Sequence, residues 1–314
     1  MTAARLRLGL VGARGYVGRE LLGLLATHPR FVVDFVSSRT SVGTPVRDVA
    51  PTAPPELRFE DLTPEAVAAR GVDAVVLALA NDASAPFCAA VDAAAPSTVL
   101  VDVSADHRFD DGWRYGLPEL RRAELRGARR IANPGCYATA TALALAPVAE
   151  LLCAPAEAFG VSGYSGAGAT PSPRNDVEAL RDNVMPYSLT GHLHEREVTR
   201  HVAPVHLMPH VAPFFRGMLV TVALPLTRTL TLEELIERYE ARYAGEPFVR
   251  VQPAAPLPRD AARAPHATLG GFAVGERRAV VVATLDNLLK GAASQALQNL
   301  NLAFGLPEAM GVLP

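Results

Sequence analysis

The first part of the chain alternates short apolar runs with segments of helical apolar spacing. The apolar runs predict strands at 6–11, 31–36, 73–80 and 99–103. The apolar spacing between them favours a helix at 17–26, and the segments at 63–69 and 85–93 are helix-like or rich in turns. Because buried strands that alternate with helices are typical of a doubly wound parallel sheet, the pattern predicts a Rossmann-type α/β domain.

The pattern changes after residue 136. Longer strands, some of them alternating apolar and polar positions, are expected at 158–163, 217–224 and 278–284. An amphipathic helix is expected at 231–243, a loop at 253–265 and a last helix at 287–304. These elements predict an α+β domain over 137–286 on a mostly antiparallel sheet. The last helix returns to the first domain, which then comprises 1–136 and 287–314.

Composition indicates where the protein works and which partners it can have. The chain has 314 residues, a formal net charge of −2 and three cysteines. The near-neutral charge gives no reason to expect nucleic-acid binding. No run reaches the roughly 20 apolar residues that span a membrane. The three cysteines lack metal-ligand spacing and are too few for a disulfide scaffold. We expect a cytoplasmic protein without a signal peptide, membrane partner or metal.

A glycine-rich turn follows the first strand and opens a helix. Glycines allow a tight turn and close backbone approach to a pyrophosphate, which the N–H groups at the helix start can bind. The expected dinucleotide-binding residues are Gly12, Arg14, Gly15, Tyr16, Val17 and Gly18. The second strand ends at Ser37, Ser38 and Arg39, without the acidic residue that usually binds the ribose of NAD. Hydroxyls and a guanidinium suit the 2′-phosphate of NADP instead.

Cys136 is the candidate nucleophile. Pro134 and Gly135 favour a turn, and the residues from Tyr137 to Pro147 favour a helix. A thiol at a helix N-terminus has a lowered pKa, and the N–H groups there can hold an oxyanion. Cys88 and Cys153 lie among alanines and are interpreted as small buried residues.

Histidines supply the candidate acid/base. His192 and His194 stand two residues apart, and an imidazole titrates near neutral pH. Metal binding is the competing interpretation, but no ligand spacing of the known kinds is present.

Eight motifs, in order along nearly the whole chain, resemble the N-acetyl-gamma-glutamyl-phosphate reductase family, within the aspartate-semialdehyde dehydrogenase superfamily. They are GARGYVG at 12–18, VSADHR at 103–108, YGLPEL at 115–120, NPGCY at 133–137, SGYSGAG at 162–168, HLHEREV at 192–198, PH at 209–210 with RGM at 216–218, and DNLLKGAA at 286–293.

The resemblance implies a mechanism and site residues. The thiol of Cys136 attacks an acyl phosphate, and NADPH reduces the resulting thioester to N-acetylglutamate semialdehyde, a step of arginine biosynthesis. Of the two histidines, His192 is taken as the acid/base, with His194 and Glu197 binding the substrate or supporting the residues that do; the sequence does not decide the order of the two histidines.

Asn287, by the same resemblance, contacts the nicotinamide. Arg108 follows the fourth strand at the carboxyl edge of the sheet, where ligands bind, and is the candidate phosphate ligand. Ser165 lies in a glycine-rich turn that either reaches the substrate or simply connects strands. The resemblance further implies that 137–286 carries catalysis and oligomerisation, and members of the family are usually homodimers or homotetramers.

Three alternatives stay open. An aminoadipyl-phosphate reductase of the lysine pathway, with or without a carrier protein, differs by one methylene group, which discriminates by only about 1–3 kcal/mol. An aspartate-semialdehyde dehydrogenase usually has other residues after its cysteine. A non-catalytic NADP-binding sensor would lack the cysteine or the histidines.

Overall fold

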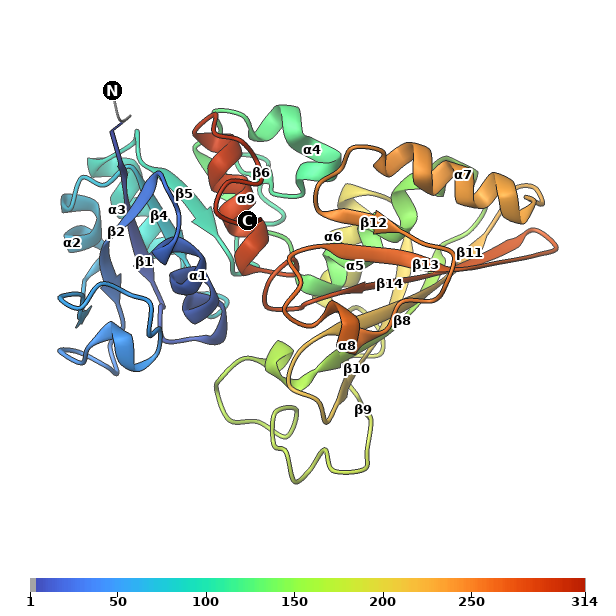
Figure 1. Cartoon of the computed structure of the whole chain (residues 1–314), viewed down its shortest axis with the longest axis horizontal. Coiled ribbons are helices and arrows are strands. Elements are labelled where there is room, and N and C mark those ends of the chain that lie inside the picture. Colours follow the sequence, from blue (N-terminus) through green and yellow to red (C-terminus); the bar gives the residue numbers. More distant parts are fainter. Residues whose placement is uncertain (1–3, 314) are drawn as a thin grey trace. The chain divides into compact units, whose positions relative to one another are not determined.

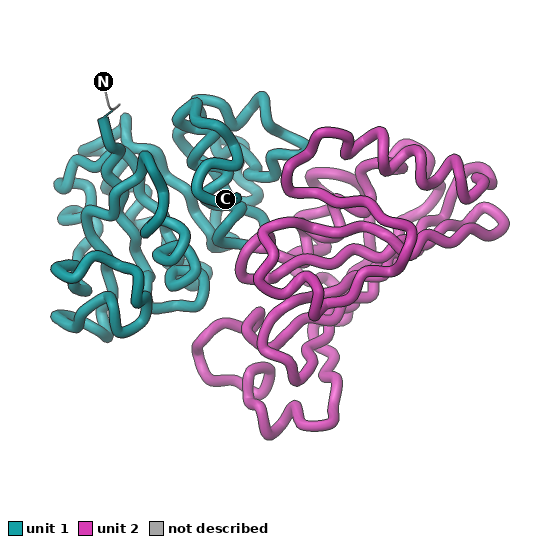
Figure 2. The backbone as a smooth tube through the Cα atoms, viewed as in Figure 1, with its two compact units in different colours: residues 1–134, 292–314 teal, residues 135–291 magenta. Residues whose placement is uncertain are grey.

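The computed structural model describes residues 4–313, which form two compact units. Unit 1 comprises residues 1–134 and 292–314 of the chain, and unit 2 comprises residues 135–291 (Figure 2). The chain therefore passes between the units at Pro134–Gly135 and Gly291–Ala292, whereas the sequence placed these boundaries after 136 and 286. Cys136 and Asn287 both belong to unit 2.

Unit 1 is built on a sheet of seven strands. The strands are β1 (Leu6–Val11), β2 (Phe31–Ser37), β3 (Phe59–Glu60), β4 (Ala74–Leu77), β5 (Val99–Asp102), β6 (Arg114–Tyr115) and β7 (Arg130–Ala132). The helices are α1 (Tyr16–Ala26), α2 (Pro64–Ala69), α3 (Ala85–Ala94), α4 (Pro118–Leu125) and α9 (Ala293–Ala303), with a short 3-10 turn, η1 (Val46–Asp48).

The sheet of unit 1 is parallel throughout, with the order β3-β2-β1-β4-β5-β7-β6. The order reverses between β1 and β4, and ligands of doubly wound sheets bind beyond the carboxyl ends of the strands at such a point. The glycine turn after β1 lies there. The predicted doubly wound domain is confirmed.

Unit 2 is built on a second sheet of seven strands (Figure 1). The strands are β8 (Ala156–Gly163), β9 (Met185–Pro186), β10 (Val205–Ala212), β11 (Met218–Pro225), β12 (Val249–Val251), β13 (Ala267–Gly275) and β14 (Arg278–Leu285). The helices are α5 (Cys136–Leu145), α6 (Leu193–His201), α7 (Leu232–Tyr243) and α8 (Pro258–Ala261), with 3-10 turns η2 (Ala146–Leu151) and η3 (Tyr164–Ala167).

The second sheet has the order β12-β13-β14-β11-β8-β10-β9. The pairs β12·β13 and β8·β10 are parallel and the other pairs are antiparallel, so the predicted, mostly antiparallel sheet is confirmed. Helix α5 packs on β11 and β14, and α7 packs on β12 and β13. A Cβ at Gly160 would meet the Tyr137 ring at 2.3 Å, so the lack of a side chain at Gly160 allows α5 to pack closely against the sheet.

The other face of this sheet stays partly open. Along β8 and β11 the burial alternates, with every second side chain at least partly exposed. These side chains are mostly apolar on the central strands: Phe159, Val161, Met208, Leu219, Val280 and Val282.

Two predicted elements are wrong in part. Residues 287–292 were expected to begin the last helix, but α9 begins at Ala293, because Asp286 accepts the N–H groups of Leu288 and Leu289 and holds this segment in turns. The loop predicted at 253–265 contains α8, which Pro258 opens at the first helical position.

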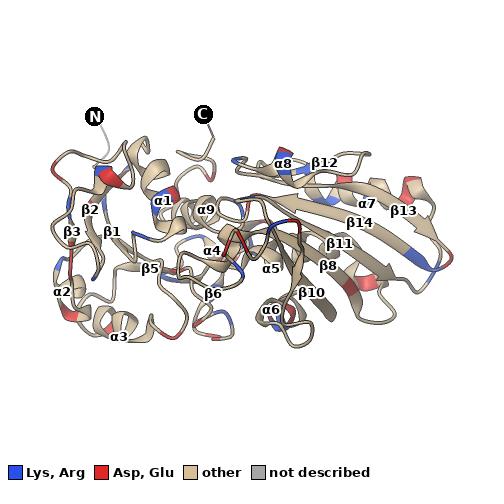
Figure 3. Cartoon of the chain, turned by 90° about the horizontal axis from the view of Figure 1, so that it is seen from below, with Lys and Arg blue, Asp and Glu red and all other residues tan. Residues whose placement is uncertain are grey.

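Acidic and basic residues are spread along the ribbons of both units rather than gathered by sign (Figure 3). Within the described part of the chain, no helix is long and apolar enough to cross a membrane.

Candidate active site

Cys136 is the first residue of α5, as predicted. Gly135 precedes it in an extended conformation, with φ −73° and ψ 155°, and the Gly135 carbonyl accepts the Thr139 N–H at 2.8 Å to start the helix. Every residue of α5 after Cys136 is buried, and no described side chain caps the helix start. The thiol therefore lies beside N–H groups whose dipoles favour a thiolate.

Helix α6 holds the turn before the thiol. The Glu197 carboxylate is fully buried and accepts the Gly135 N–H at 3.0 Å. The His194 ring lies against Gly135, since a Cβ there would come within 2.1 Å of His194 Nε2. His194 and Glu197 stand three residues apart and share one face of α6. This face fixes the backbone just before Cys136.

His192 and His194 lie together, with ring centroids 4.8 Å apart. His192 is the N-cap of α6, and its Nδ1 accepts the His194 N–H at 3.1 Å. A neutral imidazole that accepts at Nδ1 carries its proton on Nε2. Burial lowers the pKa of His192, so the neutral form dominates at pH 7. His192 thus presents a hydrogen-bond donor at Nε2.

Three further residues of the same cluster were not predicted as site residues. The Tyr137 hydroxyl donates to the His210 carbonyl at 2.7 Å. The ring of Tyr187 lies 5.6 Å from that of His192, and the Arg174 guanidinium lies 5.0 Å over the Tyr187 ring. Burial raises the pKa of both tyrosines, so both stay protonated. Tyr187 and Arg174 come from the long segment between η3 and α6, where no periodicity marks any residue.

Ser165 and Asn287 are bonded to each other. The Asn287 Nδ2 donates to Ser165 Oγ at 2.9 Å, and Asn287 Oδ1 accepts the Gly217 N–H at 2.9 Å. The adjacent Asp286 is fully buried and accepts from Arg216 Nε at 2.6 Å. The side chain of Asn287 is largely used to join two turns, so its predicted contact with nicotinamide would involve only its remaining N–H.

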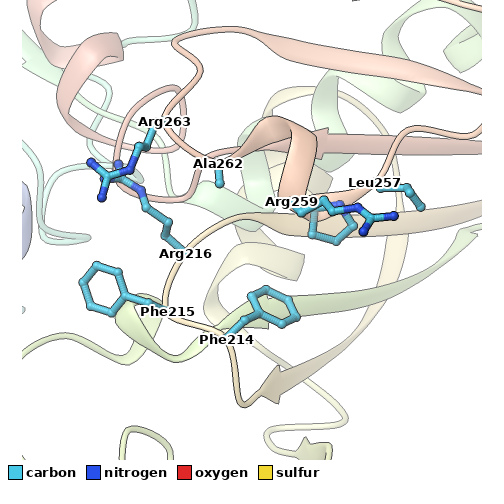
Figure 4. Close-up of a pocket in the computed structure, with 8 residues that line it drawn as sticks. Phe214, Phe215, Arg216, Leu257, Arg259, Ala262 and Arg263 are labelled. Carbon is cyan, nitrogen blue, oxygen red and sulfur yellow. The ribbon is translucent and has the colours of Figure 1, made fainter.

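A pocket of about 590 Å³ opens beside these turns (Figure 4). One wall is Phe214–Arg216, before β11, and the other is the α8 region with Arg259 and Arg263. The Phe215 carbonyl accepts the Ser165 N–H at 3.0 Å, so a hydrogen bond joins the pocket wall to the turn that contains Ser165.

The glycine turn of unit 1 fits a dinucleotide. Gly12 has φ +81°, and a Cβ there would lie 2.3 Å from the Ala78 carbonyl oxygen. A Cβ at Gly18 would lie 2.6 Å from the backbone of Ala13. At Gly15 the nearest such atom is 3.6 Å away, so its missing side chain leaves open space at the start of α1. That space suits a pyrophosphate.

The end of β2 supports this turn. The Ser37 carbonyl accepts the N–H groups of Gly12 and Ala13, and the buried Ser37 hydroxyl accepts the Leu62 N–H at 3.3 Å. Ser38 is partly exposed, and Arg39 is exposed beyond it. Ser37 thus holds the turn, while Ser38 and Arg39 remain the predicted ligands for a ribose phosphate.

Arg108 is buried within unit 1. Its Nε donates to the Asn133 carbonyl and its Nη2 to the Val103 carbonyl, each at 2.9 Å. The neighbouring Asp106 accepts two N–H groups and a hydroxyl at the start of α3. Much of this motif therefore serves the fold, and Arg108 fixes the strand end three residues before Cys136. Its contact with phosphate remains a prediction.

The other cysteines differ from each other. Cys88 is buried, and burial raises its pKa to about 12, which makes it a poor nucleophile. Cys153 was expected to be buried but is exposed, because it lies in the turn between η2 and β8.

Comparison with known proteins agrees with this geometry. The family model of the semialdehyde dehydrogenase NAD binding domain matches residues 7–128, and that of the semialdehyde dehydrogenase dimerisation domain matches residues 136–287. N-acetyl-gamma-glutamyl-phosphate reductase of Stenotrophomonas maltophilia is 55% identical over 99% of both chains. The enzyme of that name from Xylella fastidiosa is 53% identical over 99% of this chain and 95% of its own.

The chain belongs to the N-acetyl-gamma-glutamyl-phosphate reductase family. Among solved structures, aspartate semialdehyde dehydrogenase II of Vibrio cholerae matches with a TM-score of 0.76 over 96% of this chain and 98% of its own, at 19% identity. The Candida albicans enzyme matches with a TM-score of 0.74 over 95% of this chain and 98% of its own, at 16% identity. These structures share the fold, and the resemblance inferred from the motifs is confirmed.

Proposed function

We propose that the protein reduces N-acetyl-gamma-glutamyl phosphate to N-acetylglutamate 5-semialdehyde with NADPH and releases phosphate. The observation that carries this is the thiol of Cys136 at the start of α5, within the cluster of His192, His194 and Tyr187. The substrate follows from relatives of that name at 52–55% identity over nearly their whole length. The step belongs to arginine biosynthesis.

The first half-reaction forms a thioester. The sulfur of Cys136 attacks the acyl carbon, the carbon–oxygen bond to phosphate breaks, and the thiol proton passes to a base. The base is His194 or His192. We favour His194, because it lies against Gly135 and the Nδ1 of His192 already accepts the His194 N–H. The Nε2–H of His192, with the N–H groups at the start of α5, then stabilises the oxyanion.

The second half-reaction releases the aldehyde. NADPH, when bound, supplies the hydride that reduces the thioester carbon. The oxyanion that results collapses, the carbon–sulfur bond breaks, and the thiolate of Cys136 is regenerated. Gly12, Gly15, Gly18, Ser38 and Arg39 would hold the cofactor. The choice of NADPH over NADH rests on Arg39 and on the lack of an acid at the β2 tip.

We further propose a homodimer or homotetramer in the cytoplasm. The open face of the unit 2 sheet offers an apolar surface for association, and the matching family model is described as a dimerisation domain.

The reverse reaction tests the function. Wild type, Cys136→Ser and the control Cys153→Ser receive N-acetylglutamate semialdehyde, phosphate and NADP, and NADPH absorbance is followed. We expect phosphate-dependent NADPH formation that Cys136→Ser abolishes and Cys153→Ser retains, since Cys153 is exposed in another turn. Turnover of aspartate semialdehyde or of the aminoadipate homologue instead would keep the mechanism and overturn the substrate. NADP binding without turnover of any of the three would indicate a sensor.

A further inference from the structure

The active-site cluster of unit 2 contains a cation whose role is unassigned. Arg174 is exposed, and its guanidinium lies 5.0 Å over the ring of Tyr187. The same ring contacts His192 at 5.6 Å between centroids. Among residues 4–313, no carboxylate forms an ion pair with Arg174. A cation held over an aromatic ring beside the thiol's cluster therefore has its charge available to a ligand.

Asn175, the residue next to Arg174, holds in place the loop that carries both. Asn175 Nδ2 donates to the carbonyls of Gly168 and Thr170, at 2.8 and 2.7 Å, and its Oδ1 accepts the Ser172 N–H at 2.7 Å. These bonds tie the loop to the end of the Ser165 turn. A guanidinium on an anchored backbone loses less conformational freedom when it binds a ligand.

Tyr187, the platform under Arg174, is anchored as well. Its N–H donates to the Pro209 carbonyl at 3.2 Å, and the preceding β9 pairs with β10. Arg174 therefore stands one ring away from His192, on a surface fixed to the sheet.

We propose that Arg174 binds the α-carboxylate of the substrate and so determines specificity for an N-acylated α-amino acid. This rests on the proposed function. The reacting carbonyl must lie at Cys136, and the α-carboxylate lies at the other end of the same carbon chain. The phosphoryl group, by contrast, leaves from the reacting carbonyl itself, next to the thiol. A cation beyond the Tyr187 ring is placed for the distant anion, and a guanidinium can bind a carboxylate bidentately.

The test pairs a change in the protein with a change in the ligand. Arg174→Gln removes the cation, and 4-acetamidobutanal, which is the semialdehyde without its α-carboxylate, removes the anion. In the reverse reaction we expect Arg174→Gln to raise KM for N-acetylglutamate semialdehyde about 10–100-fold with kcat nearly unchanged. With 4-acetamidobutanal, wild type and Arg174→Gln should have the same kcat/KM, because the interaction is already absent.

Arg181→Gln is the matched control. Arg181 lies on the same segment, is exposed and pairs with Glu178 at 2.7 Å, and its loss should leave KM unchanged. Arg174→Lys should restore part of the affinity, since it keeps the charge but not the planar fork.

A second readout is the pH profile of kcat/KM. Glu195 and Arg174 are the charges that act on His192, and Tyr187, Tyr137 and His194 are the other titratable groups around it. Burial and then Arg174 lower the pKa of His192, while Glu195 raises it. Arg174→Gln should move the corresponding limb of the profile to higher pH.

Two results would overturn the assignment. An unchanged KM for the semialdehyde in an active Arg174→Gln variant excludes a contact with the carboxylate. An increase in KM for inorganic phosphate alone assigns Arg174 to the phosphoryl group instead. Failure of the proposed function looks different, because wild type itself would then not turn over the semialdehyde.

Discussion

At the scale of single residues, sequence located the nucleophile and left its proton acceptor open. Cys136 could be predicted because a proline–glycine turn directly before an apolar, helix-forming run marks the start of a helix. The order of His192 and His194 could not, since it depends on which imidazole nitrogen the N-cap of α6 uses. Tyr187 and Arg174 were missed because their positions come from loop anchors that leave no periodic pattern.

The two histidines predict different kinetic losses. His192→Asn keeps a good N-cap side chain for α6 but removes the Nε2–H donor, so we expect a fall in kcat of about 10²-fold with the fold intact. His194→Gln removes the base beside Gly135, and we expect a fall of about 10²–10⁴-fold. Single-turnover phosphate release separates the cases, because His194→Gln should slow thioester formation and remove the limb of the pH profile that belongs to the base, whereas His192→Asn should keep that limb. The opposite result, with the limb of the base lost in His192→Asn and kept in His194→Gln, would reverse the roles.

At the scale of elements, the sequence predicted four strands of the parallel sheet, β1, β2, β4 and β5, and three of the mixed sheet, β8, β11 and β14. The short strands β3, β6 and β7 of the parallel sheet were missed. Strands buried on both faces appear as continuous apolar runs, such as β1, β4 and β5. β10 and β13 were missed, because β10 has histidines and a proline in its sequence and β13 has adjacent glycines. Their partners in the sheet, rather than their own propensities, make them strands.

Two tyrosine hydroxyls bind the carbonyl groups at the end of α5, and the sequence did not predict these contacts. Tyr239 and Tyr243 of α7 are buried, and their hydroxyls donate to the carbonyls of Ala144 and Leu143. These carbonyls belong to the last turn of α5, where partners within the helix run out.

We therefore expect the two tyrosine hydroxyls to contribute measurably to the free energy of unfolding. Tyr239→Phe and Tyr243→Phe should each lower the free energy of unfolding by about 1–2 kcal/mol, because each leaves a buried carbonyl without its donor. Tyr164→Phe is the control, since among the described residues the Tyr164 hydroxyl makes no hydrogen bond. Urea unfolding with an unchanged m-value measures the difference. Equal stability of all three variants would mean that water replaces the tyrosines.

At the scale of the whole molecule, sequence predicted a second, mostly antiparallel sheet but could not outline the face of that sheet that stays open. Partly exposed apolar residues of four neighbouring strands, β8, β10, β11 and β14, lie together on this face. They form a continuous apolar surface, whereas the exposed apolar residues of a monomer are usually scattered singly. Its breadth depends on the strand order, which places β11 between β14 and β8. No local pattern contains that order, since the strands are far apart along the chain.

This face predicts how the oligomer can be broken. Phe159 is 43% exposed at the centre of it, with its ring 4.4 Å from that of His210, and Glu157 is exposed on the same strand. In a twofold symmetric interface each substitution occurs twice, so Phe159→Glu places four carboxylates, with Glu157, near one axis. We expect sedimentation velocity to show a smaller species than wild type, with an unchanged circular dichroism spectrum. Val42→Glu, which charges a 55% exposed apolar residue of unit 1, should leave the sedimentation coefficient as it is. If Phe159→Glu sediments as wild type does, the subunits associate through another surface.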